Sequence, residues 1–140
     1  MRSHETTITV RFNEVDTYGV AWHGHYVAWM EVGRHELARR FDLDVESIAA
    51  AGFLAPVVGL ELQFRHPARF DEELTVRTTL HRNETATLEF RSVIVDASGR
   101  TCAVGTTVHA LTDKGGVLQY HPPALIMERV ERLLAWQEGV

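Results

Sequence analysis

The sequence predicts an α+β domain in which an antiparallel β-sheet wraps around one long central α-helix. Apolar residues alternate with a period of two near the N-terminus, recur every three to four residues from Tyr26 to Phe41, and then alternate again. Short turns separate the later alternating segments, and such turns favour antiparallel hairpins over helical crossovers. The length of 140 residues and the hydrophobic content of 45% suit one compact domain covering residues 1–140.

The first predicted strand runs from Thr6 to Phe12 and is followed by a loop. A strand is indicated because alternate residues would place three apolar side chains on one face: Ile8, Val10 and Phe12. The segment from Asn13 to Gly24 contains two glycines and no sustained period, so we expect a loop there.

The central helix is predicted from Tyr26 to Phe41, roughly 24 Å at helical rise. Its apolar face comprises Tyr26, Met30, Gly33, Leu37 and Phe41. A glycine is costly inside a helix unless another backbone approaches closely, so we expect Gly33 to pack tightly against the sheet. A short second helix is expected from Asp44 to Ala51, where Gly52 stops it.

Most of the remaining chain predicts strands. The alternating segments are Val57–His66, Glu73–His81, Ala86–Asp96 and Arg100–Thr112. Turn residues lie between extended segments at positions 82–84, 96–99 and 113–116. Pro122 and Pro123 then open a terminal amphipathic helix, whose apolar residues are Ile126, Val130, Leu133 and Leu134.

Charge and composition exclude several classes of protein. The formal net charge is -5 and charges of both signs are spread along the chain, so no basic surface is predicted for nucleic acid. No apolar run is long enough for a signal peptide or a membrane span, so we expect a cytoplasmic protein without membrane partners. The single cysteine, Cys102, excludes an intrachain disulfide and a cysteine-rich zinc site, and it is interpreted as a small core residue.

Two segments carry a resemblance to a known family. The spacing in DTYGVAWHGHY resembles the signature of the 4-hydroxybenzoyl-CoA thioesterase family at Asp16, Gly19, Val20, His23 and Tyr26. Residues 64–74 resemble a second family segment, a strand ending in an aromatic residue and followed by Pro-Ala and an acidic turn. The resemblance implies the hot-dog fold and hydrolysis of an acyl- or aroyl-CoA thioester to free acid and CoA, without a separate cofactor.

The sequence departs from the family pattern at two places. His25 stands where the family often has Asn, so the hydrogen bonds that hold the loop are expected to differ. The family's Gly-Asp turn is replaced by Asp71-Glu72. Aspartate tolerates the left-handed backbone conformation that a turn requires, so we expect this turn to survive.

Asp16 is the candidate catalytic carboxylate. A thioester carbonyl develops negative charge on oxygen when it is attacked, and the first turn of a helix offers unpaired N–H groups to that charge. A carboxylate on the preceding loop could act there as general base for water or as nucleophile. The resemblance implies that the backbone N–H at His23 is the oxyanion donor, while the His23 side chain could orient water or substrate. The expected substrate-binding residues are Gly19, Val20, Trp22, Gly24 and Tyr26.

Other readings of these residues remain. A divalent metal at His23, His25 and His35 is disfavoured, because His35 would lie about 15 Å further along the helix; Glu31 and His35 are interpreted as an exposed i, i+4 pair. An acyl-CoA hydratase or dehydratase on the same scaffold is an alternative, but we find no His-Gly-Pro-like run. A non-catalytic module that binds acyl ligands is a further alternative.

The predicted fold also has consequences for assembly. A single curved sheet around one helix leaves strand edges and an apolar rim unprotected. The resemblance implies dimers whose sheets join side by side, often paired into tetramers. We therefore expect a homo-oligomer, either a dimer or a homotetramer.

Overall fold

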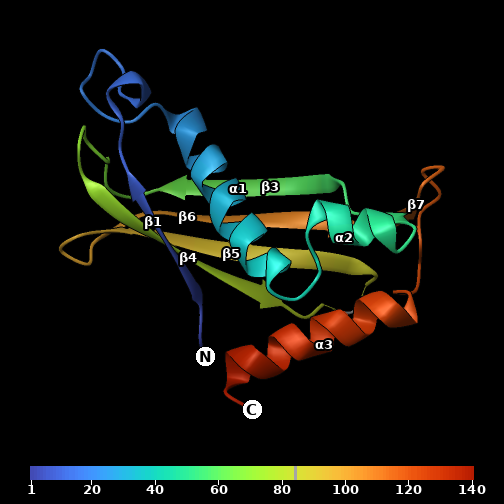
Figure 1. Cartoon of the computed structure of the whole chain (residues 1–140). Coiled ribbons are helices and arrows are strands. Elements are labelled where there is room, and N and C mark those ends of the chain that lie inside the picture. The colour runs from blue at the N-terminus through green and yellow to red at the C-terminus, as the bar shows by residue number, and fades with distance from the viewer. Residues whose placement is uncertain (84) are drawn as a thin grey trace.

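The computed structural model describes residues 1–83 and 85–140, so Glu84 of the predicted turn at 82–84 lies outside the described residues. It confirms the α+β architecture: one face of a five-stranded antiparallel sheet carries the helices (Figure 1). The sheet order is β1-β4-β5-β6-β3, formed by His4–Thr9 (β1), Val57–Phe64 (β3), Glu73–His81 (β4), Thr87–Asp96 (β5) and Thr101–Ala110 (β6). None of the helices in the described part of the chain is long and apolar enough to span a membrane.

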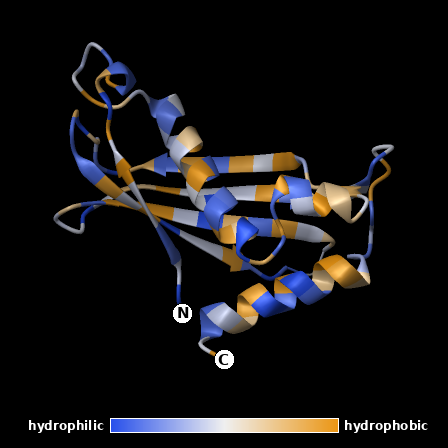
Figure 2. Ribbon diagram, in the orientation of Figure 1, coloured by the Kyte–Doolittle hydropathy of each residue, from blue (hydrophilic) through white to orange (hydrophobic). Residues whose placement is uncertain are grey.

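Three helices and a small second sheet complete the domain. The helices are His23–Arg39 (α1), Val45–Ala50 (α2) and Ala124–Glu138 (α3). Phe53–Leu54 (β2) pairs with Thr112–Asp113 (β7), which the sequence did not predict because two-residue strands show no period. α1 crosses β1, β4 and β5, and α3 packs near β4 with Ile126, Val130 and Leu133 buried. Hydrophobic and hydrophilic residues alternate along the ribbon of α3 (Figure 2).

The prediction that Phe12 lies on the buried face of the first strand is wrong. β1 ends at Thr9, and residues Phe12–Glu14 form a 3-10 turn. The Arg11 N–H donates to the Glu14 carboxylate at 2.8 Å instead of continuing the strand ladder. Phe12 is consequently 79% exposed, whereas Val10 is buried as predicted.

The central helix begins and ends earlier than predicted. α1 starts at His23, within the segment assigned to the loop, and stops at Arg39. No side chain caps its first turn, so the usual sequence signal for a helix start is missing. Phe41 lies beyond the helix end and packs beside Trp136 of α3, with ring centroids 5.8 Å apart.

Gly33 marks the closest approach of α1 to the sheet, as predicted. A Cβ atom added there would lie 2.7 Å from Thr78 Oγ1 and 2.9 Å from Val76 Cγ1, both on β4. Distances this short exclude a side chain, so glycine is needed for the helix to rest on β4. The core has two parts along α1, one around Tyr26 and Trp29 and one around Leu37 and the two smaller helices.

α3 is fixed to the sheet through a buried amide. The Gln137 side chain accepts a hydrogen bond from the Leu80 N–H at 2.7 Å and donates one to the Leu80 carbonyl at 2.9 Å. β1 pairs with β4 only as far as Thr78, so the amide occupies the place that a further residue of β1 would take. Backbone groups that would otherwise be buried and unpaired are satisfied in this way.

Candidate active site

The loop that carries Asp16 is a tight turn. The Gly19 N–H donates to the Asp16 carbonyl at 2.9 Å, and the Asp16 N–H donates to the Val20 carbonyl at 2.9 Å. Gly19 has a φ of 77°, a left-handed conformation that glycine adopts without strain. Asp16 Oδ1 accepts the Tyr18 N–H at 2.8 Å. The carboxylate is therefore held by its own loop through one oxygen, as in an Asx-turn.

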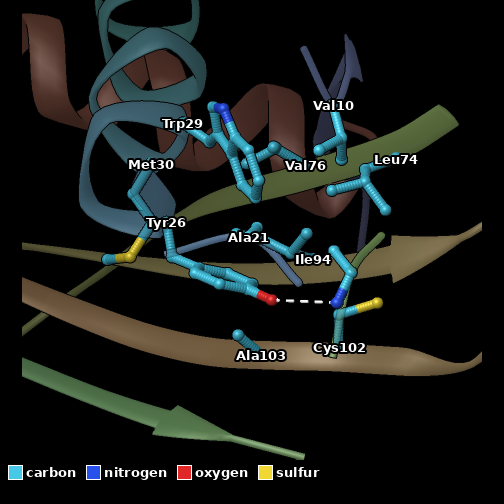
Figure 3. Close-up of a cluster of buried hydrophobic side chains, with 11 residues drawn as sticks. Val10, Ala21, Tyr26, Trp29, Met30, Leu74, Val76, Ile94, Cys102 and Ala103 are labelled. Carbon is cyan, nitrogen blue, oxygen red and sulfur yellow. Dashed lines mark hydrogen bonds between the residues drawn. The ribbon is translucent and has the colours of Figure 1, made fainter. Parts of the chain in front are cut away.

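The loop is bound to the segment between β3 and β4. The Ala21 N–H donates to the Ala68 carbonyl at 2.7 Å, and Val20 forms a bridge with Arg69. The Ala68 N–H donates in turn to the Tyr26 hydroxyl at 3.1 Å, the dashed line in Figure 3. Burial raises the pKa of Tyr26. The neutral hydroxyl thus ties this segment to α1.

The first turn of α1 presents unpaired donors. Trp22 at the N-cap supplies no side-chain acceptor, and the His25 N–H donates to the Trp22 carbonyl at 3.0 Å. The N–H groups of His23 and Gly24 have no acceptor among the described residues. Together with the positive end of the helix dipole, they can stabilise negative charge on a bound oxygen.

Asp16 and His23 meet at one concave surface, the Asp16 hollow, with a volume of about 320 Å³. The residues that line it are Asp16, Val20, Ala21, His23, Tyr26, Phe64, Arg65, His66 and Pro67. Of the expected substrate-binding residues, Val20 and Tyr26 line the hollow. Gly19, Trp22 and Gly24 lie outside its lining. Gly19 shapes the turn, and the Trp22 ring lies across Gly24, where an added Cβ would be 2.1 Å from the ring. Asp16 is the one carboxylate among the described lining residues.

His66 and Glu14, two titratable residues near Asp16, were missed as site residues. Arg65 and His66 reach the hollow from the end of β3, and His66 lies in the second family-like segment, which was the available signal. Glu14 is buried behind the loop, with 2% of its surface exposed. Glu14 lies between Asn13 and Val15 and belongs to no periodic pattern, and its partner Trp29 lies on the next element, so the sequence gave no signal for its role.

A second concavity, the His109 cavity, lies at the other half of α1 and measures about 290 Å³. Its lining is largely apolar and includes Ala38, Ile48, Leu54, Pro56, Leu88 and Phe90. His109 is buried, with Nδ1 3.1 Å from the Ala55 carbonyl, and burial lowers its pKa, which favours the neutral ring. At its rim, Arg34 binds Glu31 at 2.6 Å, so the predicted Glu31–His35 pair is wrong. The planar guanidinium offers a bidentate partner that histidine cannot match.

A long helix that rests on a five-stranded antiparallel sheet is the arrangement that defines the hot-dog class of folds. The chain belongs to the Thioesterase superfamily, whose family model matches residues 18–103. The match begins just after Asp16, so the family assignment does not depend on that residue.

Individual proteins agree with this assignment. A hypothetical protein, TT1821 from Thermus thermophilus, is 33% identical in sequence; the superposition has a TM-score of 0.81 and covers 93% of this chain and 98% of that one. Acyl-CoA thioester hydrolase YbgC from Escherichia coli O6:H1 is 28% identical over 90 residues, which are 64% of this chain and 67% of YbgC. The DHNA-CoA thioesterase of Staphylococcus aureus has the same fold, with a TM-score of 0.83 at 20% identity over 100% of this chain and 97% of that one.

Proposed function

We propose that this protein hydrolyses acyl-CoA thioesters to free acid and CoA, with Asp16 as the catalytic carboxylate. The observation that carries the proposal is the Asp16 hollow, which is lined by one carboxylate and by His23, the residue at which α1 begins with unpaired N–H groups. The similarity to YbgC, which is named as an acyl-CoA thioester hydrolase, supports this substrate class.

The proposed reaction uses few groups. The thioester oxygen accepts the His23 N–H, and the negative charge that develops on it is stabilised by the helix terminus. Asp16 either removes a proton from the attacking water or attacks the carbonyl carbon to give an anhydride that water then opens. The CoA thiolate leaves readily in both routes. Arg65, at the edge of the hollow, is our candidate for binding the CoA phosphates.

The free edge of β3 supports the expected homo-oligomer. Within the described residues, β3 pairs with β6 alone, so its other edge has unpaired backbone groups there. Large apolar side chains on this strand are also exposed: Val57 (47%), Val58 (64%), Leu60 (48%) and Phe64 (53%). We propose that two copies pair their β3 edges antiparallel about a two-fold axis, which would pair the unpaired backbone groups and cover the apolar side chains.

The proposed pairing accounts for the His109 cavity. In an antiparallel β3 pair, the residues before Val57 of one copy lie beside the residues after Phe64 of the other. The former include Leu54 and Pro56 of the cavity, and the latter include Arg65 of the hollow. We propose that the acyl group enters the cavity of the partner copy. A cavity of about 150 Å³ holds benzene, so about 290 Å³ suits a medium-chain or aromatic acyl group.

A panel of acyl-CoA substrates tests the proposed function. We expect thiol release from octanoyl-CoA and benzoyl-CoA with a higher kcat/KM than from acetyl-CoA, because only the larger groups fill the cavity. Thiol release with a chromogenic disulfide reagent measures this. Water addition to an enoyl-CoA without thiol release would indicate a hydratase, and tight binding without turnover would indicate a binding module; either result contradicts the proposal.

A charged residue on the β3 edge tests the assembly. We expect the parent protein to sediment as a dimer or tetramer at micromolar concentration, and Leu60→Lys to shift it toward monomer, because lysine protects strand edges from pairing. Leu125→Lys is the matched control, since Leu125 is 48% exposed, as is Leu60, and lies on α3, which packs near β4. A parent protein that is monomeric, or a Leu60→Lys variant that assembles like the parent, would argue against β3 pairing.

A further inference from the structure

Glu14 is a buried carboxylate for which the proposed reaction has no use. Moving a carboxylate out of water costs several kcal/mol unless the group is paired. Glu14 accepts hydrogen bonds from the Arg11 N–H at 2.8 Å, the Arg11 side chain at 3.3 Å and the Trp29 indole N–H at 3.1 Å. Burial acts to raise the pKa of Glu14, but the bonds from Arg11 and Trp29 outweigh it and lower the pKa, so the carboxylate is ionised at neutral pH.

The two ends of the Asp16 loop meet at Glu14. Its carbonyl accepts the Trp22 N–H at 2.9 Å, which closes the loop at the residue before α1. Its side chain then reaches Trp29 in the second turn of α1, and His25 Nδ1 lies 4.0 Å from the same carboxylate oxygen. Among the side-chain hydrogen bonds of the described residues, the Glu14–Trp29 bond is the one that joins residues 12–21 to α1.

The other hydrogen bonds of the loop do not join it to α1. Asp16 bonds within its own turn, and Ala21 bonds to Ala68 in the segment before β4. Those contacts shape the loop and attach it to the sheet. The distance from Asp16 to the N–H groups of His23 and Gly24 depends on how the loop is held against the helix, and Glu14 makes that connection through a buried ring that cannot move freely.

We infer that Glu14 is a positioning residue, which holds Asp16 within reach of a carbonyl carbon whose oxygen is bound at the N-terminus of α1. This inference rests on the proposed function, since it takes the roles of Asp16 and of the helix N–H groups from there. A displacement of about 1 Å at a reacting group can lower turnover about 100-fold, so a small shift of the loop would be visible in kcat.

Removing either partner of the Glu14–Trp29 bond tests the inference. Glu14→Gln keeps the shape but brings an NH₂ group against the donors, and Trp29→Phe removes the indole N–H while it keeps a buried ring. We expect each variant to lower kcat between about 10-fold and 100-fold with little change in KM. The double variant should be no slower than the slower single variant, because both remove the same bond.

Asp96→Asn is the matched control, since Asp96 is also a buried carboxylate and holds the β5–β6 turn through Ser98 and Arg100. We expect it to lower the melting temperature but to retain the parent kcat well below that temperature. Near-parent kcat in folded Glu14→Gln and Trp29→Phe, with Asp16→Asn inactive, would overturn the inference alone. Full activity of Asp16→Asn, or no thiol release by the parent, would overturn the proposed function and this inference with it.

Discussion

Replacing Asp16 with asparagine is expected to lower the turnover of acyl-CoA thioesters by at least about 100-fold. Asparagine has nearly the same size but provides neither a base nor a nucleophile. Its amide oxygen can still accept the Tyr18 N–H that now bonds to Asp16 Oδ1. The loop should therefore keep its conformation, and substrate binding and the melting temperature should change little. Thiol release under saturating octanoyl-CoA, together with calorimetry, measures both effects.

His23→Ala is the comparison for this variant. The proposed oxyanion donor at His23 is the backbone N–H, which alanine also supplies, so we expect a smaller loss of turnover than in Asp16→Asn. Near-normal hydrolysis by a well-folded Asp16→Asn protein would refute the catalytic assignment. The carboxylate would then have only its observed role as acceptor in the turn.

Replacing Gly33 with valine is expected to destabilise the fold by about 3 kcal/mol. The new Cβ would lie 2.7 Å from Thr78 Oγ1, and the nearest carbon of Val76 would be 2.9 Å away. Thr78 and Val76 are fully buried on β4, so neither can move aside without opening the core. α1 would have to shift away from the sheet along its length. Chemical denaturation followed by circular dichroism measures the change in unfolding free energy.

Gly24→Ala is the matched glycine substitution on the same helix. The three atoms nearest to an added Cβ all belong to the ring of Trp22, which is 49% exposed and can swing into solvent. Alanine also favours the helix over glycine by about 1 kcal/mol. We expect stability within about 1 kcal/mol of the parent. Equal stability of Gly33→Val and Gly24→Ala would contradict the close contact between α1 and β4.

The period of apolar residues correctly predicted the strands that have one face toward the core and the other toward solvent. β4 has the predicted bounds, Glu73–His81, because alternate residues face the core and solvent. Asp71 adopts a φ of 68°, the left-handed conformation expected where the family has glycine. The prediction failed at Phe12, where the alternation continues but the backbone turns away to bond with Glu14. The period of apolar residues does not reveal where a side chain accepts a backbone N–H that would otherwise belong to the strand.

The sequence by itself determined the class of fold and the long helix with its required glycine, because these depend on short-range period. It indicated Asp16 as the candidate carboxylate through the resemblance to the family motif. Tertiary structure alone decided which groups surround Asp16. Arg65 and His66 reach the hollow only because β3 ends beside the start of α1, and Glu14 is buried only because Trp29 of α1 lies against it. The free edge of β3 follows from its place in the sheet order, which depends on pairing between strands far apart in the chain.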